Sequence, residues 1–167
     1  MNERAIDALS DDELIARIED CAPLPDADDD DPAWLDDTTW ARARFLLAAA
    51  DEIGKRRLPR GIAPLFERAA LGDAFEMMRG LRHGPERAVA PDYAALTDIM
   101  RPLTRHERAG CRRWAVRELG ILRDPRARDE LRSALTDDEP LVRAEARDSL
   151  AMLDDGLSPR RRGATEA

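Results

Sequence analysis

Two segments of the chain carry the same arrangement of apolar and charged residues, 31 positions apart. Residues 111–122 read CRRWAVRELGIL, and residues 142–153 read VRAEARDSLAML. The matching positions are Arg112 with Arg143, Ala115 with Ala146, Leu119 with Leu150, and Leu122 with Leu153. Apolar residues recur every three or four positions, which is the spacing of an amphipathic helix. A helix repeated at a fixed period of this length predicts a stack of helical repeats.

The same spacing predicts helices along most of the chain. In residues 3–20, apolar side chains form a stripe, and Ser10 followed by Glu13 matches a capping box. We expect the other helices over residues 39–56, 62–71, 73–82, 92–101, 106–122, 125–135 and 140–153, with His83-Gly84-Pro85 ending the third of these. The predicted segments are an N-terminal amphipathic helix (1–20), an acidic linker or arm (21–37), an α-solenoid (38–156) and a disordered tail (157–167).

Composition supports an all-α fold and restricts the cellular compartment in which we expect the protein. Charged residues make up 37% of the chain and aromatic residues only 4%. No apolar run approaches the roughly 20 residues of a membrane-spanning helix, and the acidic N-terminus lacks the apolar stretch of a signal peptide. Cys21 and Cys111 do not form a CxxC pair, so we expect reduced thiols in a cytoplasmic protein.

The net charge of −8 hides a division between two parts of the chain. Residues 1–37 carry fourteen acidic residues against two arginines, whereas residues 38–167 carry 25 basic and 21 acidic residues. An acidic arm therefore precedes a mildly basic helical body. The arm either binds a basic partner or lies against the basic part of this chain.

Residues between the end of the first copy of the repeated helix and the second copy carry a family resemblance. They are Leu119-Gly120 with Leu122, then Asp124-Pro125-Arg126-Ala127, Leu131, Leu135 and Asp137, and then Val142-Arg143, Ala146 and Leu150. Residues 92–153 resemble HEAT repeats, particularly the short phycobilisome-lyase type of roughly 30 residues. The resemblance implies antiparallel helix hairpins whose second helices line a concave face.

The resemblance also implies a ladder of hydrogen bonds between repeats, in which an Asp precedes an Arg by a few residues. Asp137 and Arg143 fit these positions. In the preceding repeat, His106 stands at the place of Asp137, so we expect the ladder to be interrupted there.

Arginines on the repeated helices are candidates for partner binding. Arg112, Arg113, Arg143 and Arg147 recur on successive second helices, where they would form a basic groove for an acidic peptide or for phosphates. The alternative is that these arginines are paired with Glu118, Glu145 and Asp148 at neighbouring-turn spacing.

Two tryptophans are candidate anchors. If residues 111, 115, 119 and 122 face the core, Trp114 is partly exposed in the groove, where a tryptophan often anchors a partner. The alternative is that Trp114 packs on the preceding repeat. Trp34 lies among aspartates in the arm, and could dock the arm onto the groove or simply pack near the helix of Trp40.

The sequence contains no signature of catalytic residues, a cofactor or a metal site. The aspartates at 26, 28, 30 and 37 only partly match a calcium loop, because Asp31 stands where glycine is needed. His106-Glu107 is a single His-Glu pair, whereas the di-iron site of deoxyhypusine hydroxylases, which are HEAT proteins, needs several. HEAT-like DNA glycosylases use a basic concave face with aromatic residues, but the acidic arm opposes a phosphate backbone.

These patterns favour a non-enzymatic protein–protein interaction module, which is an adaptor, scaffold or regulatory subunit that uses the concave face of the solenoid. One alternative is a nucleic-acid-binding or alkylation-repair-like HEAT protein. Another is an immunity or inhibitor protein that acts through its acidic arm. Both the groove and the arm remain candidates for the active surface.

Overall fold

A computed structural model describes residues 6–25, 36–69 and 75–157 of the chain, with residues 75–80 as backbone only. The described part of the chain consists of helices and turns and contains no β-strand, so the predicted all-α fold is confirmed. The α-helices are α1 (Asp11–Glu19), α2 (Asp37–Arg56), α3 (Ile62–Ala69), α4 (Phe75–Val89), α5 (Ala94–Leu103), α6 (Ala109–Leu122), α7 (Arg128–Ala134) and α8 (Pro140–Leu157).

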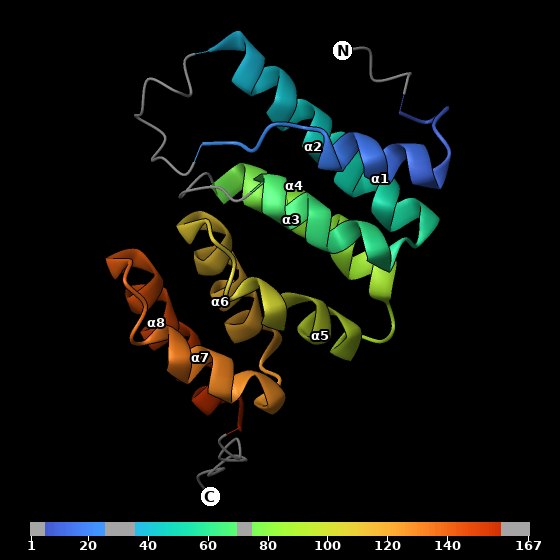
Figure 1. Ribbon diagram of the computed structural model, residues 1–167. Coiled ribbons are helices and arrows are strands. Elements are labelled where there is room, and N and C mark those ends of the chain that lie inside the picture. Colours follow the sequence, from blue (N-terminus) through green and yellow to red (C-terminus); the bar gives the residue numbers. More distant parts are fainter. Residues whose placement is uncertain (1–5, 26–35, 70–74, 158–167) are drawn as a thin grey trace, which may run out of the picture.

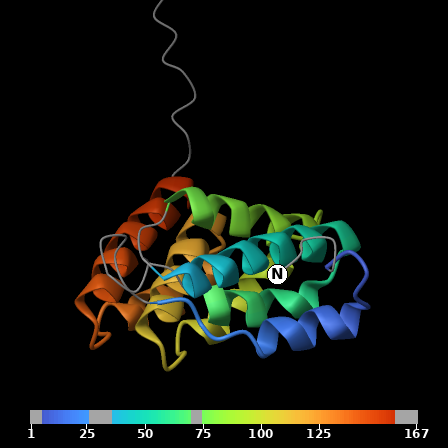
Figure 2. The same ribbon diagram turned by 90° about the horizontal axis from the view of Figure 1, so that it is seen from above.

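Consecutive helices run back and forth and stack in two layers (Figures 1 and 2). Helices α1, α3, α5 and α7 lie in one layer, and α2, α4, α6 and α8 lie in the other. The most extensive packing joins α2 to α4 and α6 to α8. Each hairpin therefore buries its apolar faces against its neighbours, as in an α-solenoid.

The first helix begins as its sequence predicts and belongs to the core. Ser10 Oγ accepts the N–H of Glu13 at 3.3 Å, and Glu13 Oε2 accepts the N–H of Ser10 at 2.8 Å. This capping box satisfies two backbone donors that the helix itself leaves without partners. Leu14 and Ile18 are then fully buried as α1 packs against α3.

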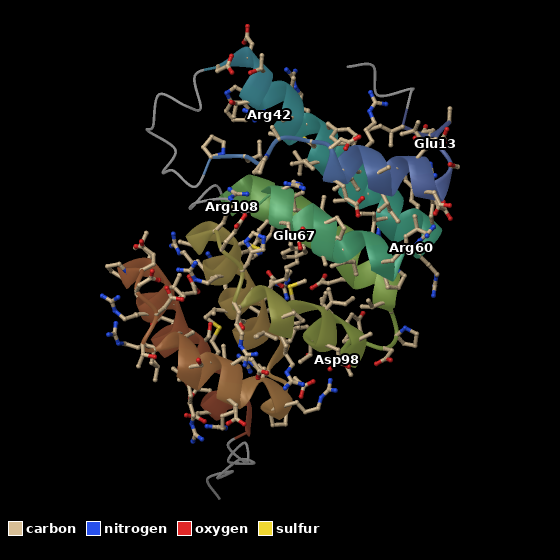
Figure 3. All side chains as sticks on the ribbon, viewed as in Figure 1. Glu13, Arg42, Arg60, Glu67, Asp98 and Arg108 are labelled. Atoms are coloured by element: carbon tan, nitrogen blue, oxygen red, sulfur yellow. The ribbon has the colours of Figure 1, made fainter. Side chains whose placement is uncertain are left out.

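The chain that follows α1 also lies against the helical body. Leu24 is buried, and arginines from distant helices hold the backbone around it (Figure 3). Arg42 Nη1 donates to the carbonyl of Pro23 at 3.2 Å, and Arg108 Nη2 donates to the carbonyl of Leu24 at 2.6 Å. The first residues of the sequence that we assigned to the acidic arm are therefore fixed to the body by charge-assisted hydrogen bonds.

The prediction that His83-Gly84-Pro85 ends a helix is wrong, because α4 continues through it to Val89. Gly84 explains this. A Cβ there would lie 1.8 Å from the carbonyl oxygen of Ala50, so only glycine allows α4 to lie directly on α2. Gly54 on α2 faces the same contact, since its Cβ would lie 2.8 Å from the carbonyl oxygen of Gly84. Burial along this contact outweighs the hydrogen bond that Pro85 removes from α4.

The repeated helices α6 and α8 keep the predicted register in the core. Ala115, Leu119 and Ala146 are fully buried, as expected for positions between layers. A Cβ on Gly120 would lie 2.5 Å from the Cβ of Ser149, so glycine sets the close approach of α6 to α8. The period of 31 residues is thus a structural period as well as a sequence period.

Candidate partner-binding surfaces

Arg112 joins one repeat to the next and does not face an open groove. Its Nε and Nη2 bind the two carboxylate oxygens of Asp137, each at 2.8 Å. Nη1 donates to the main-chain carbonyls of His106 and Glu107 at 3.0 and 2.9 Å, and Nη2 also reaches Asp138. The side chain is only 13% exposed. The expectation of Arg112 as a groove residue is therefore corrected, because its donors are used inside the stack.

The ladder is built differently from the predicted pairing of Asp137 with Arg143. Arg143 Nη1 binds the main-chain carbonyls of Asp137 and Asp138 at 2.7 and 2.9 Å, and Arg112 takes the Asp137 carboxylate. The hydrogen bonds from the Arg112 guanidinium hold the pKa of Asp137 down, from 3.8 to about 2. His106 occupies the earlier position, where its Nδ1 accepts the N–H of Arg108 at 3.1 Å.

Trp114 is buried, so the expectation that it is partly exposed is wrong. Only 2% of the residue is exposed, and its ring lies 4.3 Å from the ring of Phe66 between centroids. Its Nε1 donates to Glu118 Oε1 at 3.3 Å. The alternative, in which Trp114 packs on the preceding repeat, is confirmed. Helix α6 therefore buries Trp114 towards α3, in addition to the side chains that it buries against α5 and α8.

Glu118 is a buried carboxylate in the contact between α4 and α6. It is 3% exposed, and its Oε2 lies 3.2 Å from Arg82 Nε, which also contacts Glu86 at 3.1 Å. Burial raises the pKa of Glu118, and this effect exceeds the opposing influence of Arg82 and of the hydrogen bond from Trp114. We assign this cluster to the packing of neighbouring repeats.

The other predicted arginines differ in their exposure to solvent and therefore in their access to a partner. Arg113 Nε lies 3.6 Å from Glu145 Oε2 with both side chains largely buried. This pair joins α6 to α8, so it is not the neighbouring-turn pair within one helix that the alternative expected. Arg143 is half-buried, whereas Arg147 is exposed on α8. Trp34 falls outside the residues that the structure describes.

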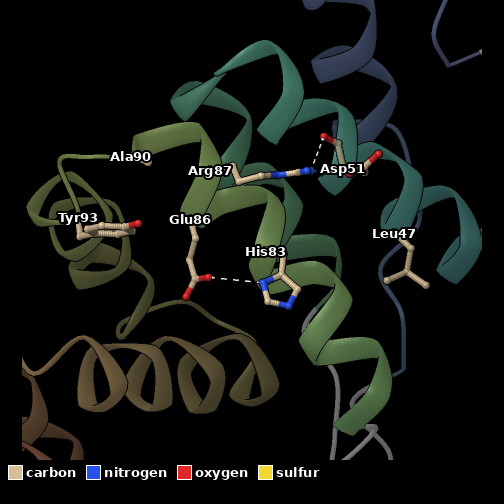
Figure 4. Close-up of a pocket in the computed structure, with 7 residues that line it drawn as sticks. All are labelled: Leu47, Asp51, His83, Glu86, Arg87, Ala90 and Tyr93. Atoms are coloured by element: carbon tan, nitrogen blue, oxygen red, sulfur yellow. Dashed lines mark hydrogen bonds and ion pairs between the residues drawn. The ribbon is translucent and has the colours of Figure 1, made fainter.

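A pocket that the sequence did not reveal opens between α2, α4 and the start of α5 (Figure 4). Its volume is about 620 Å³. The lining residues are Leu47 and Asp51 from α2, His83, Glu86 and Arg87 from α4, and Ala90 and Tyr93. Leu47, Ala90 and the Tyr93 ring supply apolar surface, and the remaining residues supply charge.

The polar residues of the pocket pair with one another. Arg87 forms an ion pair with Asp51, and His83 Nδ1 lies 3.6 Å from Glu86 Oε2. Hydrogen bonds from Lys55 first, and then from Arg87, lower the pKa of Asp51. Tyr93 is 51% exposed and stands at the edge of the pocket. The sequence signal was the only tyrosine of the chain, placed after Pro91, but the presumed helix stop at residue 83 hid its neighbours.

The described residues were also compared with the requirements of a metal site and of a membrane-spanning helix. No group of three or more His, Cys, Asp or Glu side chains there could hold a metal ion. None of the helices that the structure describes is long and apolar enough to cross a membrane. The arrangement can therefore bind through apolar contact and paired charges, which is the chemistry of a protein interface.

Comparison with known proteins agrees with the architecture. Residues 86–165 match the family model for HEAT repeats, which covers 80 of the 167 residues and includes helices α5 to α8. No curated protein and no solved structure matches the chain. The period of 31 residues, the two-layer stack and the family match together identify the matched region of this all-helical chain as HEAT-like helical repeats.

Proposed function

We propose that this protein is a non-enzymatic interaction module, an adaptor, scaffold or regulatory subunit, which binds a protein partner on the face of the α2–α4–α6–α8 layer. HEAT repeats commonly mediate protein–protein interaction, and stacked repeats present extended binding surfaces. Cys21 and Cys111 do not form a disulfide with each other. That state suits the reducing cytoplasm in which we place the module.

The pocket between α2 and α4 is the observation that carries this proposal. Its apolar part accepts an aliphatic or aromatic side chain, and the half-exposed Tyr93 ring provides a rigid edge for it. Tyrosine is enriched in protein interfaces because it buries much apolar area at little cost in conformational entropy. The ion pair of Asp51 and Arg87 beside it can bind the main chain of an extended peptide.

The pocket replaces the predicted arginine groove as the main binding site. Arg112 and Trp114 serve the packing of repeats, so neither is free to bind a partner. Of the predicted set, Arg143 and Arg147 stay in the proposal as contributors on α8.

The test is a quantitative capture of partners from native lysate with the full chain as bait. Tyr93→Ala is compared with Leu141→Ala, since both residues are large, apolar and about half exposed, at 51% and 49%. We expect Tyr93→Ala to reduce capture of a specific partner at least fivefold, and Leu141→Ala to leave it unchanged. Equal capture by all three proteins, with equal thermal stability, would refute the pocket.

A second bait separates the alternative functions. Removing residues 1–37 would delete the buried Leu14 and Ile18, so neutralising the acidic run is the better change. In this bait the aspartates at positions 26 and 28–31 become asparagine. Loss of the partner would make the acidic run the binding element, and nucleic acid on this bait would favour a nucleic-acid-binding protein. Retention of the partner supports the module as proposed.

A further inference from the structure

Arginines at the interface between the α5–α6 and α7–α8 hairpins bind carboxylates. Two arginines, Arg112 and Arg101, bind carboxylates of the next hairpin, and further pairs at Arg113 and Arg126 join the same hairpins. Arg112 on α6 grips Asp137 with two hydrogen bonds of 2.8 Å. Arg101 on α5 donates through Nε to Glu130 Oε1 on α7 at 2.7 Å. In both pairs, a guanidinium of one repeat takes a carboxylate of the repeat that follows.

The same two arginines recur one period later, on α7 and α8. Arg143 lies 31 positions after Arg112 and repeats its internal contacts, since Nη1 binds the carbonyls of Asp137 and Asp138. Its Nε and Nη2, the atoms that hold the carboxylate in Arg112, have no partner among the described residues. Arg132 lies 31 positions after Arg101 and is exposed, with no ion pair to any described residue.

The surface around these arginines is also the counterpart of a repeat interface. Gly120 of α6 faces Ser149 of α8, Val116 lies one helical turn before Gly120, and both Val116 and Gly120 are buried. Their counterparts on α8 are Arg147 and Ala151, which are exposed. Ala151 keeps a small side chain at the position of Gly120, where helices approach closely. Arg147 takes the position of the buried Val116. This surface therefore favours a partner that brings carboxylates.

We propose that the surface of α7 and α8 that faces away from α5 and α6 docks an acidic segment of a partner protein. We call it the end face and define it by Arg132, Arg143, Ala144, Arg147 and Ala151. Arg143 binds a carboxylate there through Nε and Nη2, in the geometry in which Arg112 binds Asp137. Arg132 takes a second carboxylate, as Arg101 takes Glu130, and Arg147 binds a third where Val116 has its apolar contact.

The residues that follow α8 in the sequence have the wrong charge to occupy the end face. Residues 158–167, which follow α8, carry three arginines and one glutamate, so they bring the wrong charge to the end face. The end face lies at the opposite end of the stack from α1 and α2 (Figure 1). It is separate from the pocket at Tyr93, and it shares only Arg143 and Arg147 with the proposed function.

The probe is a capped peptide with the sequence of residues 134–142, ALTDDEPLV, which contains the carboxylate that Arg112 binds. It is titrated to millimolar concentration into the ¹⁵N-labelled full chain, and the arginine Nε–Hε signals are followed by NMR. We expect the signals of Arg143 and Arg132 to shift and that of Arg112 to stay, because its carboxylate is already in place. A peptide with both aspartates changed to asparagine should bind at least about tenfold more weakly.

Variants of the protein locate the binding. Arg132→Gln removes no contact with the described residues, so it should weaken binding at least about threefold without changing stability. Arg143→Gln should weaken it further. Arg105→Gln, which removes an equally exposed arginine away from the end face, should have no effect. Tyr93→Ala should also have no effect, whatever it does to partner capture.

Three results would overturn the proposal. The first is equal binding of the aspartate and asparagine peptides, and the second is an equal effect of Arg105→Gln and Arg132→Gln. The third is the absence of any shift at Arg143. If neutralising the chain's own aspartates at 26 and 28–31 shifts the Arg143 signal without peptide, the occupant is this chain and the partner proposal is wrong.

Discussion

Replacing Asp137 by asparagine should remove most of the energy that Arg112 contributes between the last two hairpins. The substitution keeps the shape of the side chain and the oxygen that accepts the N–H of Glu139 at 2.9 Å. It removes the negative charge that two Arg112 donors face at 2.8 Å. Because both side chains are largely buried, at 13% and 11% exposure, solvent screens this interaction little.

The magnitude follows from the pKa of Asp137, which falls from 3.8 to about 2 in the folded chain. A lowered pKa means that the ionised carboxylate stabilises the fold by roughly 2–3 kcal/mol at neutral pH, at roughly 1.4 kcal/mol per unit. This contribution is complete above pH 4 and is lost as the pH falls through about 2. Asp137→Asn should therefore be roughly 2–3 kcal/mol less stable at pH 7, with the difference shrinking towards pH 2.

Urea unfolding of both proteins between pH 7 and pH 2 measures this difference directly. Asp138→Asn is the matched control, because Asp138 also contacts Arg112 at 2.8 Å but is 92% exposed. We expect it to cost less than about 0.5 kcal/mol. A loss for Asp137→Asn that stays constant with pH, or that Asp138→Asn equals, would refute an ionic tie between the repeats.

Two further changes test the packing of the second layer. Gly84→Ala places a Cβ 1.8 Å from the carbonyl oxygen of Ala50, so α2 and α4 must separate. We expect a loss of about 3 kcal/mol or more in denaturant unfolding, and an unchanged midpoint would contradict the close approach. Glu118→Gln removes a carboxylate whose pKa is raised by burial, so the wild type should lose stability relative to the variant as the pH rises above 4.5. Unfolding midpoints at pH 4 and pH 8 check this, and a wild type that gains stability relative to the variant with rising pH would contradict it.

The architecture could be predicted from the sequence because the apolar positions that recur in the repeat are also the positions that the fold buries. Ala115, Leu119 and Ala146 were assigned to the core from spacing alone, and all three are fully buried. Residue spacing gave a wrong prediction where the end of a helix depends on the neighbouring helix that it packs against. Helix α4 continues past Pro85 because Gly84 meets α2, a helix that begins almost fifty residues earlier in the chain.

The candidate site was harder to predict, because α6 has more than one buried face. Trp114 falls outside the stripe of residues 111, 115 and 119, and a single helix would leave it exposed. Phe66 of α3 covers it from the preceding repeat, which periodicity within α6 does not reveal. The pocket at Tyr93 was missed for a related reason, since it needs α2 and α4 side by side.

The arginines show how a structural ladder and a binding surface share one sequence pattern. Arg112 and Arg143 each reach back to the carbonyls five and six residues earlier, so this spacing belongs to the turn before the helix. The remaining donors of each arginine then point out of the repeat. Arg112 finds a carboxylate there because another repeat follows, and Arg143 presents the same donors without one among the described residues. The same guanidinium geometry thus serves two purposes. Within the stack, the carboxylate comes from the next repeat and the contact stabilises the fold. At the end of the stack, we propose that the carboxylate comes from a partner and the contact serves binding.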